Sequence, residues 1–271
     1  MTAKINVGGV YKDMTVAKVN IGGVWKTITA GWVNIGGVWK SMYNSFFRYG
    51  KAFFDGNGDY LSVPYSTDIS LNGDSFTVEG WVYPTNMSTD RRLFSTGGGV
   101  VGFNLTTGIH LLIQTIATTY KLSVNLKDTT ASGNIQFTTT AALTLNAWNH
   151  VSVSVNNTSK IIYASISGVV ESYSFPTQTA GIPSTNPTFE IGNIPGEVVN
   201  SNFDYTGNMK GVRITKGRAR YTANFTPDEY FQIDGADVKL CMNFAEAIGA
   251  TTFIDETGKT VTTFGNTIIV A

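Results

Sequence analysis

The side chains best placed to bind an ion lie in one short loop, where acidic and amide residues alternate with glycine. Asp55, Asn57 and Asp59 stand in the run Asp55-Gly-Asn-Gly-Asp59. Oxygen ligands at alternate positions are typical of calcium loops, although the glutamate that completes an EF-hand loop is missing. The same residue types also cap turn amides. The loop therefore predicts either a calcium site or a capped turn, and no other cofactor is expected.

Tyrosines supply a second set of candidates, for contact with sugar rings at the rim or concave face of a β-fold. A tyrosine ring combines an apolar face with a polar hydroxyl. The alternative is that most of these rings pack against the fold with the hydroxyl pointing outward. The candidates are Tyr60, Tyr65, Tyr83, Tyr205 and Tyr221.

The acidic residues lack the pairing that a glycan-cleaving enzyme needs. Retaining enzymes hold two carboxylates about 5–5.5 Å apart. Glu79 stands alone in its predicted strand, and the pairs at 228–229 and 255–256 lie in turn-like sequence. The two histidines, His110 and His150, have no third ligand nearby in the sequence that would complete a zinc site. We therefore expect a protein without enzymatic activity.

The one local basic cluster comprises Arg213, Lys216, Arg218 and Arg220. Charged side chains on a strand edge discourage pairing with other chains. The cluster therefore predicts a solvated edge, with contact to an anionic glycan or a neighbouring subunit as the alternative.

Composition narrows the class of protein. Lys and Arg total 19, as do Asp and Glu, and the formal net charge is zero. This balance argues against nucleic-acid binding, which needs a basic face. Cys241 is the single cysteine, so no intrachain disulfide is expected. The sequence shows no apolar run typical of a membrane span or a secretory leader. We therefore expect assembly inside a host cell, as for a virus particle.

Residues 1–43 contain three copies of one short sequence at intervals of 14 residues. The first copy, Ile5-Asn-Val-Gly-Gly-Val-Tyr-Lys12, returns at Val19–Lys26 and Val33–Lys40. Each copy predicts a β-hairpin with a Gly-Gly turn, in which Val7 pairs with Val10 and Asn6 with Tyr11.

So short a module rarely folds alone, so we expect its aromatic face, with Tyr11, Trp25 and Trp39, to form an interface. The hypothesis is an anchoring or oligomerisation module for a homo-oligomer such as a trimer. The alternative is a small β-meander belonging to the main globule.

Residues 44–50 read as a connector, and strand signals recur from residue 51 onward. In Phe76–Tyr83, apolar residues alternate with Thr77, Glu79 and Trp81. Many short strands with turn signals between them predict an all-β antiparallel sandwich, or jelly roll, over residues 51–271. One turn of helix is expected near Pro227–Tyr230.

Several segments between Lys51 and Phe231 resemble the laminin-G-like branch of the concanavalin A-like lectin/glucanase superfamily. This resemblance implies a lectin-like sandwich and adds weight to calcium. The run Gly217–Pro227 and the hairpin repeats are also similar to sequences of tailed-bacteriophage tail proteins. The segments are Phe54-Asp-Gly-Asn-Gly-Asp-Tyr60, Phe76-Thr-Val-Glu-Gly-Trp81, Trp148-Asn-His-Val151, Ile191-Gly-Asn193 and Gly207-Asn-Met-Lys-Gly-Val-Arg-Ile214.

The C-terminal segment 238–271 resembles pieces that normally precede the Phe-Asp-Gly strand in such domains. Two interpretations remain open. The segment completes its own sandwich as circularly permuted strands, or it is donated to a neighbouring subunit.

Together these features favour a non-enzymatic structural protein of a bacteriophage virion, in a tail or fibre, whose lectin-like domain attaches to host-surface glycans. Its partners would be other virion proteins, without nucleic acid. The alternatives are a capsid decoration protein with no receptor role and a secreted bacterial protein that binds or cleaves glycans.

Overall fold

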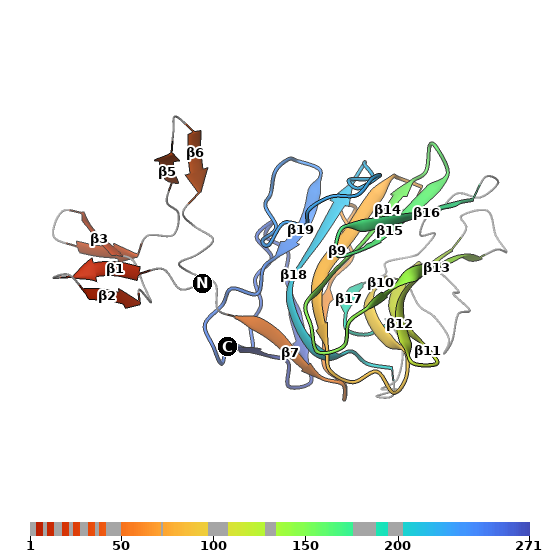
Figure 1. Cartoon of the computed structure of the whole chain (residues 1–271), viewed down its shortest axis with the longest axis horizontal. Helices are drawn as coiled ribbons and strands as arrows, with labels where there is room; N and C mark the ends of the chain where they lie inside the picture. The colour runs from red at the N-terminus through yellow and green to blue at the C-terminus, as the bar shows by residue number, and fades with distance from the viewer. Residues whose placement is uncertain are drawn as a thin grey trace. The chain divides into compact units, whose positions relative to one another are not determined.

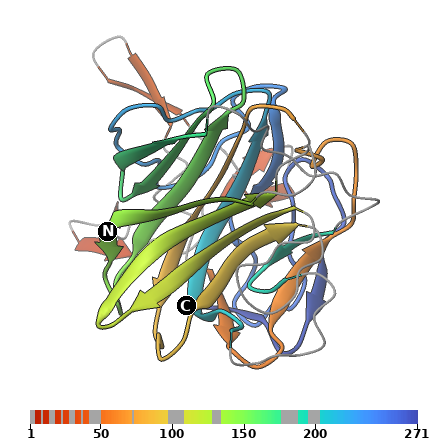
Figure 2. The same cartoon turned by 90° about the vertical axis from the view of Figure 1, so that its right-hand side faces the viewer.

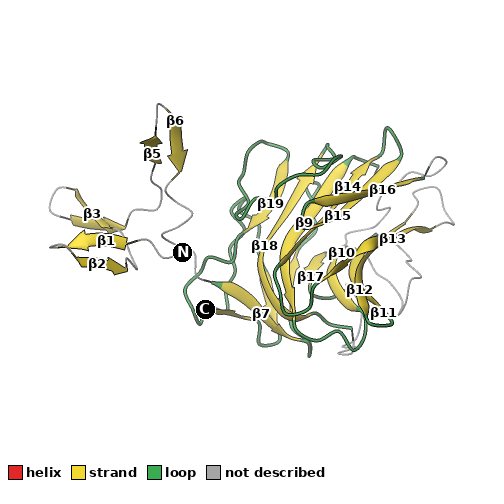
Figure 3. Cartoon of the chain, in the orientation of Figure 1, coloured by secondary structure: helices red, strands yellow, loops and turns green. Residues whose placement is uncertain are grey.

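The computed structural model describes residues 50–71, 73–96, 108–127, 134–175, 188–194 and 203–271, and six short strands between residues 4 and 41. The chain divides into two units, residues 1–49 and residues 50–271. All regular elements in these described parts are strands, and Pro227–Tyr230, where one turn of helix was expected, is a loop (Figure 3). The all-β prediction is confirmed, and the predicted helical turn is wrong.

The N-terminal unit contains three separate two-stranded antiparallel hairpins (Figure 1). In the first, Val7 pairs with Val10 and Asn6 with Tyr11, as predicted from the repeat. The other two hairpins repeat this register, with Asn20 opposite Trp25 and Asn34 opposite Trp39. The strands are β1 (Lys4–Val7), β2 (Val10–Asp13), β3 (Lys18–Ile21), β4 (Val24–Thr27), β5 (Trp32–Ile35) and β6 (Val38–Ser41).

The second unit is a sandwich of two antiparallel sheets. One sheet has seven strands in the order β13-β12-β11-β10-β17-β8-β20. Figure 2 shows this sheet with β11 to β13, in yellow-green, toward the viewer. Its strands are β8 (Tyr60–Val63), β10 (Arg91–Thr96), β11 (Ile109–Ile116), β12 (Thr119–Lys127), β13 (Asn134–Leu143), β17 (Phe189–Ile191) and β20 (Thr262–Phe264).

The second sheet has eight strands, in the order β16-β15-β14-β9-β18-β7-β21, with β19 paired beside β7 along β18. The long strand β18 pairs with β7 through its first half and with β19 through its second half. Its strands are β7 (Lys51–Asp55), β9 (Phe76–Pro84), β14 (Asn149–Asn156), β15 (Ile161–Ile166), β16 (Val169–Ser174), β18 (Thr206–Lys216), β19 (Val238–Met242) and β21 (Ile268–Val270).

The core forms because apolar side chains alternate along the strands and face the opposite sheet. Along β9, Phe76, Val78 and Val82 are buried in the core, as the alternation predicted. Gly80 completes this face without a side chain, because a Cβ there would lie 2.6 Å from the Phe94 ring. The outer faces of the two sheets are therefore left for polar residues.

The C-terminal segment supplies one strand to the seven-stranded sheet and two to the eight-stranded sheet. β19 pairs with β18, β20 with β8, and β21 with β7 of the same chain. Leu240, Met242 and Ile269 are fully buried in the shared core. Residues 238–271 therefore close the edges of this sandwich within the chain.

The described residues contain no helix with the length and hydropathy required to cross a membrane.

Candidate functional site

A row of polar side chains crosses the outer face of the seven-stranded sheet. Residues that pair directly across antiparallel strands share a face. Ser95 pairs with His110 on one side and with Glu190 on the other, and the pairing continues in both directions to the edges of the sheet. We call the result the polar row: Gln136, Asn125, His110, Ser95, Glu190, Ser62 and Thr262.

The middle of the polar row is buried, and two of its side chains have polar atoms without hydrogen-bond partners. Glu190 is 7% exposed and Asn125 is 1% exposed. The Oε2 atom of Glu190 and both amide atoms of Asn125 have no partner in the described structure. A buried polar atom without a partner costs about 1–3 kcal/mol, so such atoms mark places where a ligand or water would bind. Gln136 and Thr262 are exposed and leave the ends of the row accessible.

Glu190 is the acidic centre of the row. Burial raises the pKa of its carboxyl from 4.5 to about 7, against a hydrogen bond from the Thr188 hydroxyl and the charge of Arg92. The Thr188 hydroxyl donates to Oε1 over 3.3 Å, which leaves Oε2 as a buried acceptor without a partner. Near neutral pH the group therefore alternates between an ionised acceptor and a protonated donor.

Arg92 lies beside the polar row, and its guanidinium already has partners within the fold. Its Nη1 atom donates to Asn193 Oδ1 over 3.3 Å and lies 4.0 Å from Asp204 Oδ1. Its guanidinium also stacks over the Phe203 ring at 5.3 Å. The arginine therefore offsets Asp204 and leaves little positive charge for an incoming anion.

An aromatic pair, Tyr60 and Phe264, lies at the β20 end of the same face. The two rings are parallel within 4°, with their centroids 4.3 Å apart. Tyr60 pairs with Phe264, and Ser62 pairs with Thr262. The aromatic pair is therefore on the same face as the polar row, two residues further along β8 and β20. Burial and the charges of Glu190 and Asp204 raise the pKa of Tyr60, consistent with their proximity.

The predicted calcium residues form a capped turn. Asp55 Oδ1 accepts the Asn57 amide over 2.7 Å, and Asp59 accepts the amides of Asp55 and Asn266 on its two oxygens. Gly56 must remain glycine because its φ is +83° and a Cβ would lie 2.1 Å from the Thr206 hydroxyl. No group of three metal-ligating side chains gathers among the described residues. The structure shows the capped turn, and calcium at Asp55, Asn57 and Asp59 stays a prediction.

Two of the five predicted sugar-contacting tyrosines have their hydroxyls bonded within the fold. Tyr205 is fully buried, and its hydroxyl donates to the Asn208 carbonyl. Tyr221 stacks on Phe225 at 3.7 Å, and its hydroxyl donates to Glu79. The prediction is corrected for Tyr205, whose side chain is inaccessible, whereas Tyr221 is partly exposed and stays a prediction.

The other three tyrosines do not form one site. Tyr65 is 37% exposed just after β8, and Tyr83 contacts Trp148 edge-on, on the outer face of the eight-stranded sheet. Tyr60 alone lies beside the polar row. The interface residues Tyr11, Trp25 and Trp39 occupy described strands, but their side chains lie outside the described parts of the structure.

Glu79 is the centre of a buried polar cluster on the outer face of the eight-stranded sheet. It accepts from Arg213 Nε over 2.8 Å and lies 3.1 Å from His150 Nε2. Burial raises the pKa of Glu79, but the His150 hydrogen bond and the Arg213 charge outweigh it and lower the pKa below its usual value. Both Glu79 and Arg213 are at most 1% exposed, so the pair is structural.

The predicted basic cluster is neutralised by acids. Arg213 pairs with Glu79, Lys216 with Asp74, Arg218 with Asp237 and Arg220 with Asp234. The alternative of a patch for anionic glycans is therefore not supported, and the predicted solvated edge is wrong for the buried Arg213.

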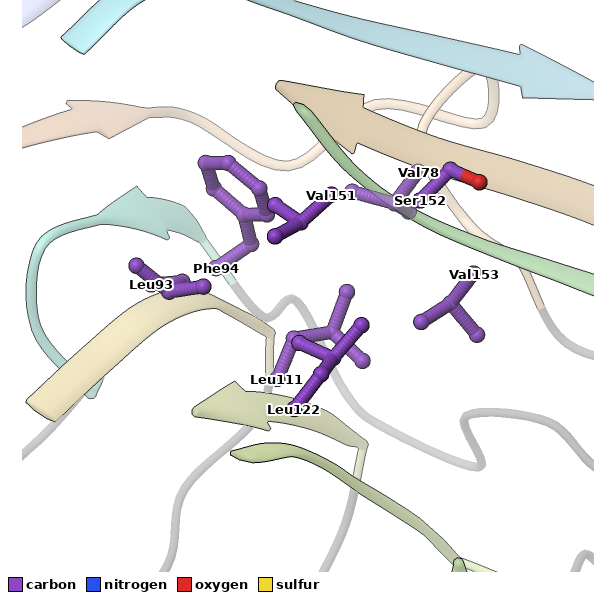
Figure 4. Close-up of a pocket in the computed structure, with 8 residues that line it drawn as sticks. All are labelled: Val78, Leu93, Phe94, Leu111, Leu122, Val151, Ser152 and Val153. Carbon is purple, nitrogen blue, oxygen red and sulfur yellow. The ribbon is translucent and has the colours of Figure 1, made fainter. Parts of the chain in front are cut away.

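A narrow apolar gap lies between the two sheets, but it has no room for a water molecule and is part of the core. Figure 4 shows Val151 and Val153 of one sheet and Leu111 and Leu122 of the other around it. The one polar residue in its lining, Ser152, bonds to Ser165 on the outer face of its sheet. The gap therefore offers a ligand no polar contact.

The sequence carries a partial signal for the polar row, in polar residues that alternate with apolar ones. Glu190 is the single polar residue between Phe189 and Ile191, and Asn125 alternates with the apolar residues of β12. Alternation alone would have placed both on outer faces. It could not show that they align, because register between strands so distant in sequence is not visible there.

Comparison with known families decides the classification. Residues 55–221, more than half of the chain, match the family Laminin_G_3, described as the concanavalin A-like lectin/glucanases superfamily. The chain belongs to this superfamily. The predicted resemblance is thus confirmed, whereas Phe264 and the strands β19 to β21 lie beyond the matched residues. The sequence matches none of the curated proteins with which it was compared.

Two solved structures share the fold of this chain. A protein from Bacteroides ovatus ATCC 8483, described as carbohydrate-binding, superposes with a TM-score of 0.56 at 17% identity, over 82% of this chain and 60% of its own. Tailspike protein 2 of the Escherichia coli O157:H7 bacteriophage CAB120 gives 0.50 at 11% identity, over 89% of this chain and 31% of its own. The chain therefore spans less than two thirds of either protein, and the likeness concerns the fold.

Proposed function

We propose that the protein binds glycans through the polar row and the aromatic pair. The observation that carries this proposal is the unpartnered Oε2 of Glu190, buried in a row of amide and hydroxyl side chains. Sugar hydroxyls both donate and accept hydrogen bonds, so they match such a row. Binding sites commonly combine a few polar groups with aromatic surface. The carbohydrate-binding description of the Bacteroides ovatus protein agrees with this proposal.

We propose further that the protein binds without cleaving. Glycan cleavage by two carboxylates needs an acid and a second carboxylate that are both free to act. Asp204, the acid beside Glu190, accepts the Gly58 amide over 2.9 Å and lies 4.0 Å from Arg92. Glu79 is enclosed with Arg213 and His150. Neither arrangement leaves a second carboxylate free beside Glu190.

The biological setting that we propose is the tail or a fibre of a bacteriophage virion, where the domain attaches to the host surface. Support comes from the three hairpin repeats and the Gly217–Pro227 run, which are similar to phage tail sequences. Several copies on one particle would raise weak binding to repeated glycans by avidity.

The test of glycan binding uses the full chain on an array of neutral and acidic oligosaccharides, followed by calorimetry on the best ligand. Glu190→Gln should weaken binding about tenfold, because a charged acceptor binds more strongly than an amide. Glu229→Gln is the matched control, an exposed acid outside the polar row. An array without a ligand, or equal affinity for both variants and wild type, would count against the polar row.

The test of the setting is mass spectrometry of purified phage particles that encode the chain, followed by electron cryomicroscopy. Density at a tail or fibre is expected. Density on the capsid lattice would favour a decoration protein, and absence of the chain from particles would refute a virion role.

A further inference from the structure

We infer that the site takes an uncharged saccharide chain of at least two rings, laid across the strands from Glu190 to Phe264. This inference rests on the proposed glycan binding and specifies the ligand class. One ring would donate hydroxyl hydrogen bonds to Glu190, and the next would stack on the exposed side of the aromatic pair.

The charges around Glu190 favour a neutral ligand. Glu190 itself would repel the carboxylate of an acidic sugar. The arginine beside Glu190, Arg92, is already engaged with Asn193 and Asp204. An acidic sugar would therefore have to break existing contacts to find a cation. A hydroxyl group needs only the buried Oε2 acceptor, which has no partner.

The spacing of the strands favours a chain over a single sugar. Glu190 lies on β17 and Phe264 on β20, with β8 between them. Two strand spacings amount to about 10 Å, and the two residues also lie one row apart. A single ring cannot contact both groups, whereas two linked rings can.

Phe264 has the environment of a stacking residue. Its side chain is 39% exposed although it is a large hydrophobic group, and Tyr60 supports one face of the ring. It adjoins the exposed Thr262, at the end of the polar row that is open to solvent. The ring is therefore held in place while presenting apolar surface beside hydroxyl groups.

Protonation of Glu190 gives an independent signature of a hydroxyl-donating ligand. The titratable and charged groups that face Glu190 are Arg92, Asp204, Tyr60 and His110. With the pKa of Glu190 at about 7, the ionised fraction rises from about a tenth at pH 6 to about nine tenths at pH 8. A ligand that needs the ionised acceptor should bind about tenfold more tightly at pH 8. An acidic ligand should show the opposite trend.

The experiment is titration calorimetry of the full chain with mannose, mannotetraose, N-acetylglucosamine, chitotetraose, galacturonic acid and tetragalacturonate, at pH 6 and pH 8. We expect a neutral tetrasaccharide to bind more tightly than its monosaccharide, and more tightly at pH 8. Phe264→Ala should weaken the tetrasaccharide about tenfold and leave the monosaccharide unchanged, whereas Phe264→Trp should retain chain binding. Tyr173→Ala is the matched control, because Tyr173 is 40% exposed and stacks on Phe137.

The outcomes separate the two proposals. Preference for tetragalacturonate, equal binding of monosaccharide and tetrasaccharide, or no effect of Phe264→Ala would overturn this inference while glycan binding stands. Failure of every probe and of the wider array to bind would overturn the proposed function and the inference together.

Discussion

At the scale of single residues, two buried carboxylates of this protein have pKa values shifted in opposite directions. Glu79 is ionised beside Arg213 and His150, and its pKa is held below the usual value. Glu190 has one carboxylate oxygen without a hydrogen-bond partner, and burial raises its pKa to about 7. A buried charge that has its hydrogen-bond and ion-pair partners stabilises one arrangement of the chain. A buried charge that lacks a partner is a place where a ligand can add a hydrogen bond.

The pH dependence of stability should expose the burial of Glu190. The folded pKa lies above the unfolded value of 4.5, so the folded state holds the extra proton between these values and stability falls as the pH rises from about 4.5 to 7. Each pKa unit corresponds to about 1.4 kcal/mol, so the full penalty above pH 7 is about 3 kcal/mol.

The free energy of unfolding of Glu190→Gln relative to wild type, measured with urea, should therefore be about 3 kcal/mol higher at pH 8 than at pH 5. Glu229→Gln should show no such gain. A Glu190→Gln gain that is the same at both pH values would mean that the carboxyl is not a buried charge.

Removal of the partner of Glu79 should be among the most destabilising single changes. Arg213→Met leaves a buried carboxylate without its cation and should cost about 3–5 kcal/mol in urea unfolding. The double variant Glu79→Met/Arg213→Met should cost less than the sum of the single variants. Arg218→Met, which breaks a half-exposed pair with Asp237, should cost under about 1 kcal/mol. Similar losses in the two arginine variants would contradict a structural role for the buried pair.

At the scale of elements, the last strands complete both sheets. β19, β20 and β21 cover the edges of β18, β8 and β7, and inward side chains of β19 and β21 join the shared core. Paired edges also remove templates for aggregation. The segment that follows the family-matched residues is therefore required for the sandwich as well as for the aromatic pair.

A pair of substitutions in this segment measures that dependence. Leu240→Ala should destabilise the protein by about 2–5 kcal/mol, because Leu240 is fully buried in β19. Ile254→Ala, at a side chain that is 62% exposed, should change stability by less than about 0.5 kcal/mol. Thermal or urea unfolding with a single transition would report both, and equal small effects would show that the segment packs loosely.

Sequence patterns predicted the elements better than the site. Alternation in Phe76–Tyr83 identified β9 and its inward face, and the Gly-Gly repeats predicted the hairpin register. Tyr205, just before β18, shows the limit, because its neighbours in the sequence do not reveal that its side chain is fully buried. The polar row depends on the register of seven strands, and Phe264 joins Tyr60 across more than 200 residues of chain. Such long-range alignments arise from tertiary packing and leave no local pattern.

At the scale of the whole molecule, the N-terminal unit repeats one hairpin three times. Two-stranded hairpins are marginal alone, so their stability in solution should come from association. We therefore keep the prediction that Tyr11, Trp25 and Trp39 form an interface between copies or with another virion protein.

Sedimentation velocity of the full chain tests this prediction. The triple variant Tyr11→Ser/Trp25→Ser/Trp39→Ser should lower the oligomer mass to that of a monomer, because the aromatic surface available for burial is lost. Trp81→Ser, which changes an aromatic residue in the second unit, serves as the control for general loss of apolar surface. An unchanged mass in the triple variant, or a monomeric wild type, would remove the oligomerisation role.

The pairing of β7 with β21 has a further consequence. Lys51 lies opposite Val270, so the chain enters and leaves the sandwich on neighbouring strands of one sheet edge. A domain with adjacent entry and exit points can be inserted into a surface loop of another protein with little loop-closure entropy. Such a sandwich can be exchanged between unrelated scaffolds as a cassette, with its polar row and aromatic pair carried along intact.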